Sequence, residues 1–327
     1  MTGATDRVEY TPGELARDAT FYVAGHRGLV GSAIVRRLQA AGFTNIVGKT
    51  SAELDLKNRD GVFEYLAEIK PRYLVLAAAK VGGILANSTY PVDFLSDNLR
   101  IQSNVLDAAL ANEVERVAFL GSSCIYPKFA EQPISENALL TGRLEPTNDA
   151  YAIAKIAGIL NIQAVRRQYG LPWISAMPTN LYGPNDNFSP TGSHVLPALI
   201  RRYDDAAKSG SWLVTNWGTG TPRREFLHSD DMADAVLHLL EHYDGPEQVN
   251  VGTGSDLTIR EIADMIAGIV GFEGETEWDT SKPDGTPQKL LDVSKLAEAG
   301  WTSKIPLDEG LERTVAWYRD HVGAIRV

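Results

Sequence analysis

The sequence predicts an α/β fold in which a doubly wound parallel sheet is joined to a smaller mixed α/β region. Short apolar runs alternate with longer helix-like stretches along the first half of the chain. The run 73–79 is apolar throughout, as is typical of a parallel strand buried on both faces. A glycine-rich turn separates the first apolar run from the first helix-like stretch, which is an arrangement typical of such sheets.

The composition limits the functions open to the chain. Its 327 residues suffice for two domains or for one α/β domain with a cap. A formal net charge of −11 argues against binding to nucleic acid. The longest apolar runs are too short to span a bilayer and no secretory signal opens the chain, so we expect no membrane partner. The single cysteine, Cys124, fits a reducing compartment, and we expect a cytoplasmic protein.

The glycine-rich turn indicates a bound dinucleotide. Residues 21–24 form a β-prone run, 25–31 read Gly-His-Arg-Gly-Leu-Val-Gly, and a helical stretch covers 32–41. Glycines in this context let a pyrophosphate approach the backbone at a helix N-terminus. The spacing is G-x-x-G-x-x-G rather than G-x-G-x-x-G, and plain packing of a helix on a strand is the alternative. The context favours a Rossmann fold.

The end of the second strand, 44–47, indicates which dinucleotide is preferred. Sites that prefer NAD often carry an acidic residue there, bonded to the ribose. This chain has Lys49 there instead, and the first acidic residue after the strand is Glu53. Lys49 and Arg27 could together meet a 2′-phosphate, so we predict NADP(H). The alternative is that both are solvated surface cations.

These segments suggest how the chain divides. We expect residues 1–20 to form a tail and 21–179 to form the dinucleotide-binding domain. Residues 180–228 and 252–327 are expected to form a substrate-binding domain, while 229–251 returns to the first. Within the first domain we expect long helices over 91–112 and 150–168.

A strand over 115–120 ends in Gly121-Ser122-Ser123-Cys124. In open α/β sheets, chemistry gathers at the carboxyl ends of strands, so these side chains are candidates for an active site. The alternatives are a small buried hydrophobe for the thiol and turn formation for the serines.

Tyr151 and Lys155 lie four residues apart at the start of the second long helix, which places them on one helix face. A nearby ammonium favours the phenolate, so we expect the pKa of Tyr151 to be lowered and its phenol to exchange a proton with a carbonyl or hydroxyl. The alternative is an ordinary surface helix with a core tyrosine.

The second half of the chain contains candidates for ligand contacts. A strand over 171–176 leads into a turn-rich segment, and His194 follows, although a lone histidine is often structural. Helices are expected over 195–208, 231–242 and 258–270, with Ser229 or Asp230 capping the second. Two cations and a tryptophan in the glycine-rich segment 217–226 suggest a charged, ring-bearing ligand, with a solvated loop as the alternative.

Several long motifs follow one another along the chain. They are GHRGLVG (25–31), AAAKVGGI (77–84), GSSCIYPK (121–128), EPTN (145–148), YAIAKIAG (151–158), MPTNLYGP (177–184), REFLH (224–228), DDMA (230–233) and KPDGTP (282–287). Together these motifs resemble the extended short-chain dehydrogenase/reductases that act on nucleotide sugars, and among these the enzymes that form GDP-L-fucose. The resemblance covers about residues 21–317, with the motifs in the same order.

The resemblance implies a two-step reaction. GDP-4-keto-6-deoxy-D-mannose is epimerised at C3 and C5, and NADPH then reduces C4 to give GDP-L-fucose. The 4-keto group acidifies both neighbouring C–H bonds, and a thiol, which titrates near about 8.5 when free, is a plausible proton acceptor.

The resemblance also assigns roles to residues. Cys124 and His194 match the epimerisation base and acid, Ser122 binds the C4 oxygen, Tyr151 protonates it, and Lys155 holds the nicotinamide ribose. The family often has Arg at the place of Lys49, so we expect a weaker preference for NADPH over NADH here. The residues that match cofactor positions are Gly25, His26, Arg27, Gly28, Leu29, Val30, Gly31, Lys49, Leu120, Gly121, Ser122, Ser123, Tyr151, Lys155, Pro178, Thr179, Asn180, Leu181 and His194. Those that match substrate positions are Arg202, Trp217, Arg224 and Asp284.

The resemblance further implies a homodimer built on the two long helices, and no metal. Two other classes of function remain open. A sugar dehydratase usually carries an acidic pair after the serine, which this chain lacks, and a simple 4-epimerase does not need the Cys124 and His194 pair. A non-catalytic binding module usually loses the tyrosine or the lysine, and this chain has both.

Overall fold

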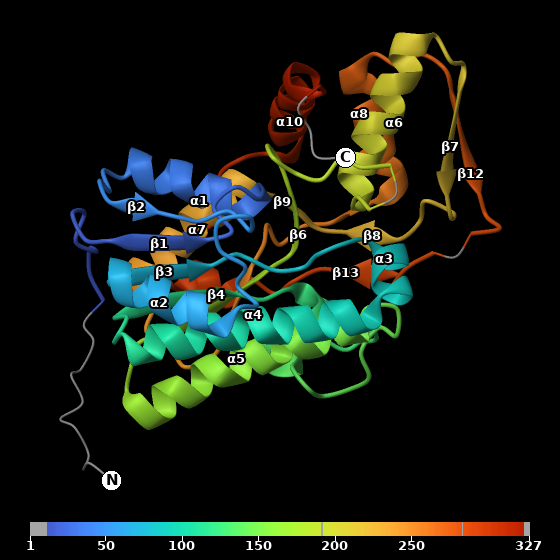
Figure 1. The fold of residues 1–327 in the computed structure, drawn as a ribbon. Helices are drawn as coiled ribbons and strands as arrows, with labels where there is room; N and C mark the ends of the chain where they lie inside the picture. Colours follow the sequence, from blue (N-terminus) through green and yellow to red (C-terminus); the bar gives the residue numbers. More distant parts are fainter. Residues whose placement is uncertain (1–11, 191, 283, 324–327) are drawn as a thin grey trace.

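The computed structural model describes residues 12–190, 192–282 and 284–323, and its centre is a six-stranded parallel sheet (Figure 1). The strand order is β10-β5-β4-β3-β1-β2. After β1 the chain adds β2 on one side and β3 on the other, so the order of strands reverses between β1 and β3. Ligands of open α/β sheets bind at such a switch point. The strands are β1 (Phe21–Ala24), β2 (Ile46–Val47), β3 (Tyr73–Leu76), β4 (Arg116–Leu120), β5 (Ile174–Pro178) and β10 (Val249–Val251).

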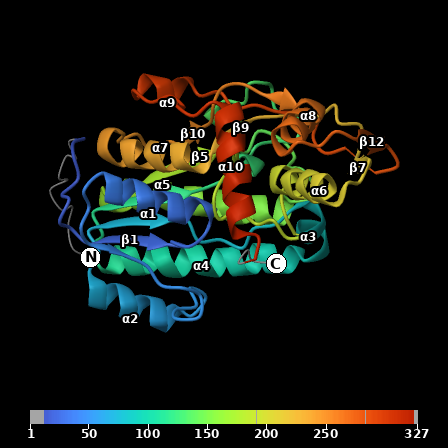
Figure 2. The same ribbon diagram turned by 90° about the horizontal axis from the view of Figure 1, so that it is seen from above.

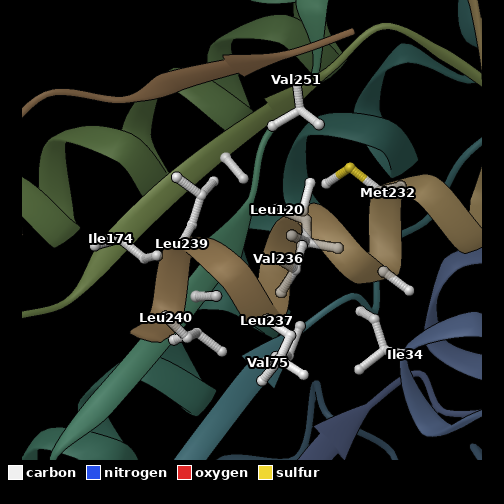
Figure 3. Close-up of a cluster of buried hydrophobic side chains, with 14 of the residues drawn as sticks. Ile34, Val75, Leu120, Ile174, Met232, Val236, Leu237, Leu239, Leu240 and Val251 are labelled. Atoms are coloured by element: carbon white, nitrogen blue, oxygen red, sulfur yellow. The ribbon is translucent and has the colours of Figure 1, made fainter. Parts of the chain in front are cut away.

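Helices cover both faces of this sheet (Figure 2). Side chains of β1 alternate between the faces, with Phe21 and Val23 in one buried cluster and Tyr22 and Ala24 in another. The first cluster packs against α1 (Leu29–Ala40) and α7 (Ser229–His242), and Figure 3 shows α7 side chains such as Val236 within it. The second packs against α2 (Arg59–Ile69), α4 (Pro91–Ala111) and α5 (Asp149–Tyr169).

A third buried cluster belongs to the later part of the chain, where α6, α8 and α10 pack together beyond the carboxyl ends of the sheet strands (Figure 1). Three small sheets accompany them, with orders β11-β8-β13, β12-β7 and β6-β9. The elements are β6 (Asn180–Tyr182), α6 (Val195–Ser209), β7 (Leu213–Trp217), β8 (Arg223–Arg224), β9 (Phe226–His228), β11 (Leu257–Thr258), α8 (Ile259–Val270), β12 (Glu275–Asp279), β13 (Gln288–Lys289) and α10 (Leu307–His321). Two short helices, α3 (Ile84–Thr89) and α9 (Ser294–Glu298), complete the set.

The predicted doubly wound α/β fold is confirmed, and several boundaries differ from those predicted. The helix expected to start at Ser32 begins at Leu29, directly after the glycine turn. His228, rather than Ser229 or Asp230, caps α7, because its ring accepts a hydrogen bond from the Asp230 N–H. Helices α2, α3, α9 and α10 were not predicted. The division into two domains stays a prediction, although β10 lies in the main sheet as expected for 229–251.

The predicted tail falls partly outside the described residues, because 1–11 are not among them. Residues 12–20 lie against the body of the molecule. Leu15 is buried, Arg17 forms a 2.6 Å ion pair with Glu241, and Ala16 N–H donates to the Tyr73 hydroxyl at 3.0 Å. No helix within the described ranges is long and apolar enough to cross a membrane.

Candidate active site

The glycine turn forms a close-packed cradle at the switch point. Gly25 has φ +86°, and a Cβ there would lie 2.8 Å from the Ala78 nitrogen after β3. A Cβ on Gly31 would lie 2.0 Å from the Gly25 carbonyl oxygen. Gly28 caps α1 without a side chain, which leaves the helix N-terminus open to an anion. Only glycine fits at positions 25 and 31, so the backbone can approach a pyrophosphate closely. Leu29 and Val30 form the first turn of α1.

Two exposed cations lie beside this cradle. Hydrogen bonds from Thr50 lower the pKa of Glu53, and the charges of Lys49 and Arg27 act in the same direction, which places both cations near that carboxylate. The Lys49 Nζ also lies 5.6 Å from the centroid of the Tyr65 ring. His26 is half-buried and packs against Gly48, and burial lowers the pKa of its imidazole. The arrangement offers positive charge at the end of β2, beside an acid that partly neutralises it.

The carboxyl end of β4 meets the start of α5. Lys155, which is only 4% exposed, donates to the Leu120 carbonyl at 2.8 Å, and its Nζ lies 5.8 Å from the centroid of the Tyr151 ring. Ser122 and Ser123 follow β4 after Gly121, and the Ser122 Oγ accepts the Cys124 N–H at 3.3 Å. The candidate residues that follow β4 and those at the start of α5, which lie apart in the sequence, are therefore neighbours in the structure.

The pKa of Tyr151 differs from the sequence prediction. Burial raises it, the neighbouring Cys124 sulfur raises it further, and only hydrogen bonding to Ser122 lowers it. Burial also lowers the pKa of Lys155 to about 8. The expectation that the ammonium would lower the pKa of this phenol is therefore wrong for the structure described, because desolvation of both groups is the larger effect.

The Cys124 sulfur is surrounded by nitrogen donors. It lies in the short 3-10 turn Ser123–Ile125 and is half-buried. The Asn148 Nδ2 donates to Sγ at 3.3 Å, and the Lys289 Nζ lies 3.9 Å from Sγ. Sequence reasoning missed both contacts. Asn148 stands in the sequence as part of the EPTN motif, and Lys289 is brought here by the pairing of β13 with β8.

His194 and segment 178–181 are positioned by other contacts. His194 precedes α6 and is exposed, although surrounding protein atoms desolvate the imidazole and lower its pKa. Thr179 N–H donates to the Val251 carbonyl at 3.0 Å, and Asn180 Nδ2 donates to the Glu225 carbonyl at 2.8 Å. These bonds join Pro178 through Leu181 to both β10 and β9.

Glu225 is a second feature that sequence reasoning missed. Its carboxylate is fully buried and accepts backbone N–H groups of Thr253, Gly254 and Leu291 at 2.6, 2.8 and 3.0 Å. It therefore fixes the loop after β10 to the strand that carries Arg224. Its only sequence signal is an acid beside two arginines, which also fits an exposed loop.

The predicted substrate residues form two groups. Burial lowers the pKa of Arg224, while nearby Cys124, Asp284 and Glu145 act in the opposite direction, so these groups are neighbours. Asp284 is exposed and accepts both the N–H and the hydroxyl of Thr219, at 2.9 and 2.7 Å.

The second group lies on α6 and β7. Arg202 donates to the side-chain Oδ1 of Asn216, and the next residue, Trp217, is 65% exposed. The Lys282 Nζ lies 5.8 Å from the centroid of this indole, and an exposed aromatic ring beside a cation suits an aromatic, charged ligand. No cluster of three or more His, Cys, Asp or Glu side chains suited to a metal occurs among the described residues.

Comparisons with known proteins agree with this geometry. The family model described as the NAD dependent epimerase/dehydratase family matches residues 21–252. GDP-L-fucose synthase 1 of Arabidopsis thaliana is 60% identical over 306 residues, which are 94% of this chain and 95% of that protein. GDP-L-fucose synthase of Escherichia coli (strain K12) is 51% identical over 314 residues, which are 93% and 98%.

A solved structure is also similar. The GDP-mannoheptose C4 reductase of Campylobacter jejuni, with NADP bound, has a TM-score of 0.86 and 36% identity, covering 93% of this chain and 99% of that chain. A parallel sheet with a glycine cradle at its switch point defines a dinucleotide-binding α/β protein. The chain belongs to the NAD dependent epimerase/dehydratase family and, within it, to the GDP-L-fucose synthase group. The resemblance stated from the sequence is thereby confirmed.

Proposed function

We propose that this protein converts GDP-4-keto-6-deoxy-D-mannose to GDP-L-fucose, by epimerisation at C3 and C5 and reduction at C4 with NADPH. One observation carries the proposal: Cys124, held by two nitrogen donors, lies beside Tyr151 and Ser122 at the end of β4. A proton acceptor and a proton donor for a sugar ketone are therefore adjacent. The GDP-L-fucose synthases similar to this chain support the assignment.

The cradle fits NADP(H). A pyrophosphate would lie against Gly25, Gly28 and Gly31 at the start of α1, while Arg27 and Lys49 would face a 2′-phosphate. Lys155 would hold the nicotinamide ribose, and segment 178–181 would line the nicotinamide end. When bound, NADPH supplies the hydride for C4.

For the reduction, the chain must deliver a proton to the C4 oxygen. We assign this to Tyr151, because its phenol lies beside Ser122 and Cys124 at the end of β4 and is protonated at neutral pH. Ser122 orients the same oxygen by a hydrogen bond. During epimerisation the same two groups would stabilise the enolate oxygen, as an oxyanion hole does.

For the epimerisation, one group must remove a proton from carbon and another must return one on the opposite face. We assign removal to Cys124 and return to His194. The 4-keto group makes both steps feasible, since the carbanion is delocalised onto its oxygen. Arg224 would bind the GDP pyrophosphate, with Asp284, Arg202 and Trp217 contacting the rest of the nucleotide sugar.

The test is proton NMR of the purified protein with NADPH and GDP-4-keto-6-deoxy-D-mannose in heavy water. GDP-L-fucose with deuterium at C3 and C5 is the expected product. A reduced but unepimerised sugar would instead identify a C4 reductase, the alternative suggested by the similar Campylobacter jejuni enzyme. In a matched arm, Cys124→Ser is expected to abolish deuterium incorporation while NADPH binding persists, and unchanged incorporation would remove Cys124 from the mechanism.

We also propose a homodimer through α4 and α5, which pack on each other. Both helices expose apolar side chains, including Val92 (73%), Ile153 (46%) and Leu160 (41%). Light scattering during gel filtration would show a mass near twice 35.6 kDa, and a monomer would refute this proposal.

The single cysteine supports the further proposal of a reducing, cytoplasmic location.

A further inference from the structure

Asn148 stands at the N-cap position of α5 but does not cap the helix. Its side chain makes no cap hydrogen bond, although asparagine is among the best N-cap residues. The amide instead donates from Nδ2 to the Cys124 sulfur at 3.3 Å, and its Oδ1 is buried with no hydrogen-bond partner in the part of the chain described. The side chain therefore contacts the sulfur rather than the free N–H groups of the helix N-terminus.

Lys289, from a different element, also approaches the same sulfur, with its Nζ 3.9 Å from Sγ. Strands β13 and β8 are parallel, with Gln288 opposite Arg223 and Lys289 opposite Arg224. Gln288 and Arg223 both bind the Asp256 carboxylate, at 2.6 and 2.8 Å. Because side chains alternate along a strand, Lys289 and Arg224 point to the other face, where both lie near Cys124.

Three elements therefore place charged or titratable groups around the thiol. Tyr151 comes from α5, Arg224 from β8 and Lys289 from β13. A thiolate is stabilised by cations and N–H donors, and the thiolate is the reactive form of cysteine.

We propose that Asn148 and Lys289 are positioning residues for Cys124, holding its sulfur in place and stabilising its thiolate as a proton acceptor. The proton-acceptor role rests on the proposed function, whereas stabilisation of the thiolate does not. The two parts can therefore be tested apart. Cys124 is the chain's single cysteine, so alkylation of the whole protein by iodoacetamide reports on this thiol alone.

The experiment measures the alkylation rate of the full chain as a function of pH. The limiting rate at high pH reports access to the sulfur, and the midpoint reports its ionisation. Lys289→Gln is expected to move the midpoint upward by about one pH unit and to slow alkylation at pH 7 about tenfold, while Lys289→Arg restores most of the wild-type profile. Asn148→Asp, which keeps a good helix cap but adds a negative charge, is expected to shift the midpoint more than Asn148→Ser does.

Lys295→Gln is the matched control, because it removes a lysine charge on α9 that pairs with Glu247, away from the sulfur. Its profile is expected to match that of the wild type. Profiles of folded Lys289→Gln and Asn148→Asp that superpose on the wild-type profile would overturn the proposal. So would a midpoint shift of the same size in Lys295→Gln.

The role in the reaction has its own readout. Deuterium exchange at C3 and C5 is expected to fall at pH 7 in Lys289→Gln and to recover as pH is raised, in parallel with alkylation. Shifted alkylation with unchanged exchange would refute the catalytic part. If the wild type itself exchanges nothing while alkylation shifts as expected, the proposed function fails and thiolate stabilisation stands.

Discussion

The buried ammonium of Lys155 lies 5.8 Å from the centroid of the Tyr151 ring, and it donates a hydrogen bond to the Leu120 carbonyl rather than to the Tyr151 hydroxyl. Four-residue spacing on a helix brings the two side chains together, and tertiary packing then buries Lys155 and partly buries Tyr151. Burial disfavours the charged form of each group, which raises the pKa of the phenol and lowers that of the ammonium to about 8. In this pair, desolvation outweighs mutual attraction.

Tyr151→Phe is expected to lower kcat by about 10²- to 10⁴-fold, because the substitution removes the proton donor to C4 and keeps the ring. The ring packs edge-on against Phe94 at 6.4 Å, so folding is expected to be unaffected. NADPH oxidation with substrate measures the loss, and thermal unfolding is the control. Turnover within a few-fold of wild type would refute the role of Tyr151 as the acid.

Lys155→Met is expected to abolish reduction and to raise the free energy of unfolding at pH 7 by about 2 kcal/mol. The native pKa of about 8 is below the unfolded value of 10.5, so the native state binds the proton more weakly. The wild type therefore carries the full desolvation cost below about pH 8 and gains stability as pH rises towards 10.5.

The advantage of the variant should accordingly shrink between these pH values. Urea unfolding of both proteins at pH 7 and pH 10 measures it. A difference in stability that does not depend on pH would show that burial does not perturb this lysine.

Gly31→Ala is expected to weaken NADPH binding and to destabilise the fold by about 2 kcal/mol, because its Cβ would lie 2.0 Å from the Gly25 carbonyl oxygen. Gly268→Ala in α8 is the control. No atom lies within 4 Å of that Cβ position, and alanine should stabilise the helix by about 0.5–1 kcal/mol. Calorimetry measures the stability of both variants, and NADPH titration measures their affinity for the coenzyme. Equal effects of Gly31→Ala and Gly268→Ala would contradict the close-packed cradle.

Lys49→Ala is expected to raise KM for NADPH about tenfold and to leave KM for NADH unchanged, because only NADPH carries the 2′-phosphate. Lys49→Arg should strengthen the preference, since a guanidinium can bind phosphate with two parallel hydrogen bonds. Steady-state kinetics with both coenzymes measure this. An equal change for NADPH and NADH would place the 2′-phosphate elsewhere.

Local patterns in the sequence determined the main sheet and half of the site. The apolar run before Gly25 and the Tyr151–Lys155 spacing appear in the structure where they were predicted, and the glycine turn is present but shorter, because α1 begins at Leu29. Their physical causes act over a few residues: strand burial, the absence of a Cβ, and the helical repeat.

Only tertiary structure decided the surroundings of Cys124 and the protonation of the Tyr151–Lys155 pair. Lys289 comes within 3.9 Å of Cys124 from 165 positions away, through strand pairing that no local pattern specifies. The pKa values of Tyr151 and Lys155 depend on how much protein covers them, which the sum of many distant contacts sets. Which groups are present and which of them lie on one helix face follow from the order of residues, whereas their charge and their partners depend on packing.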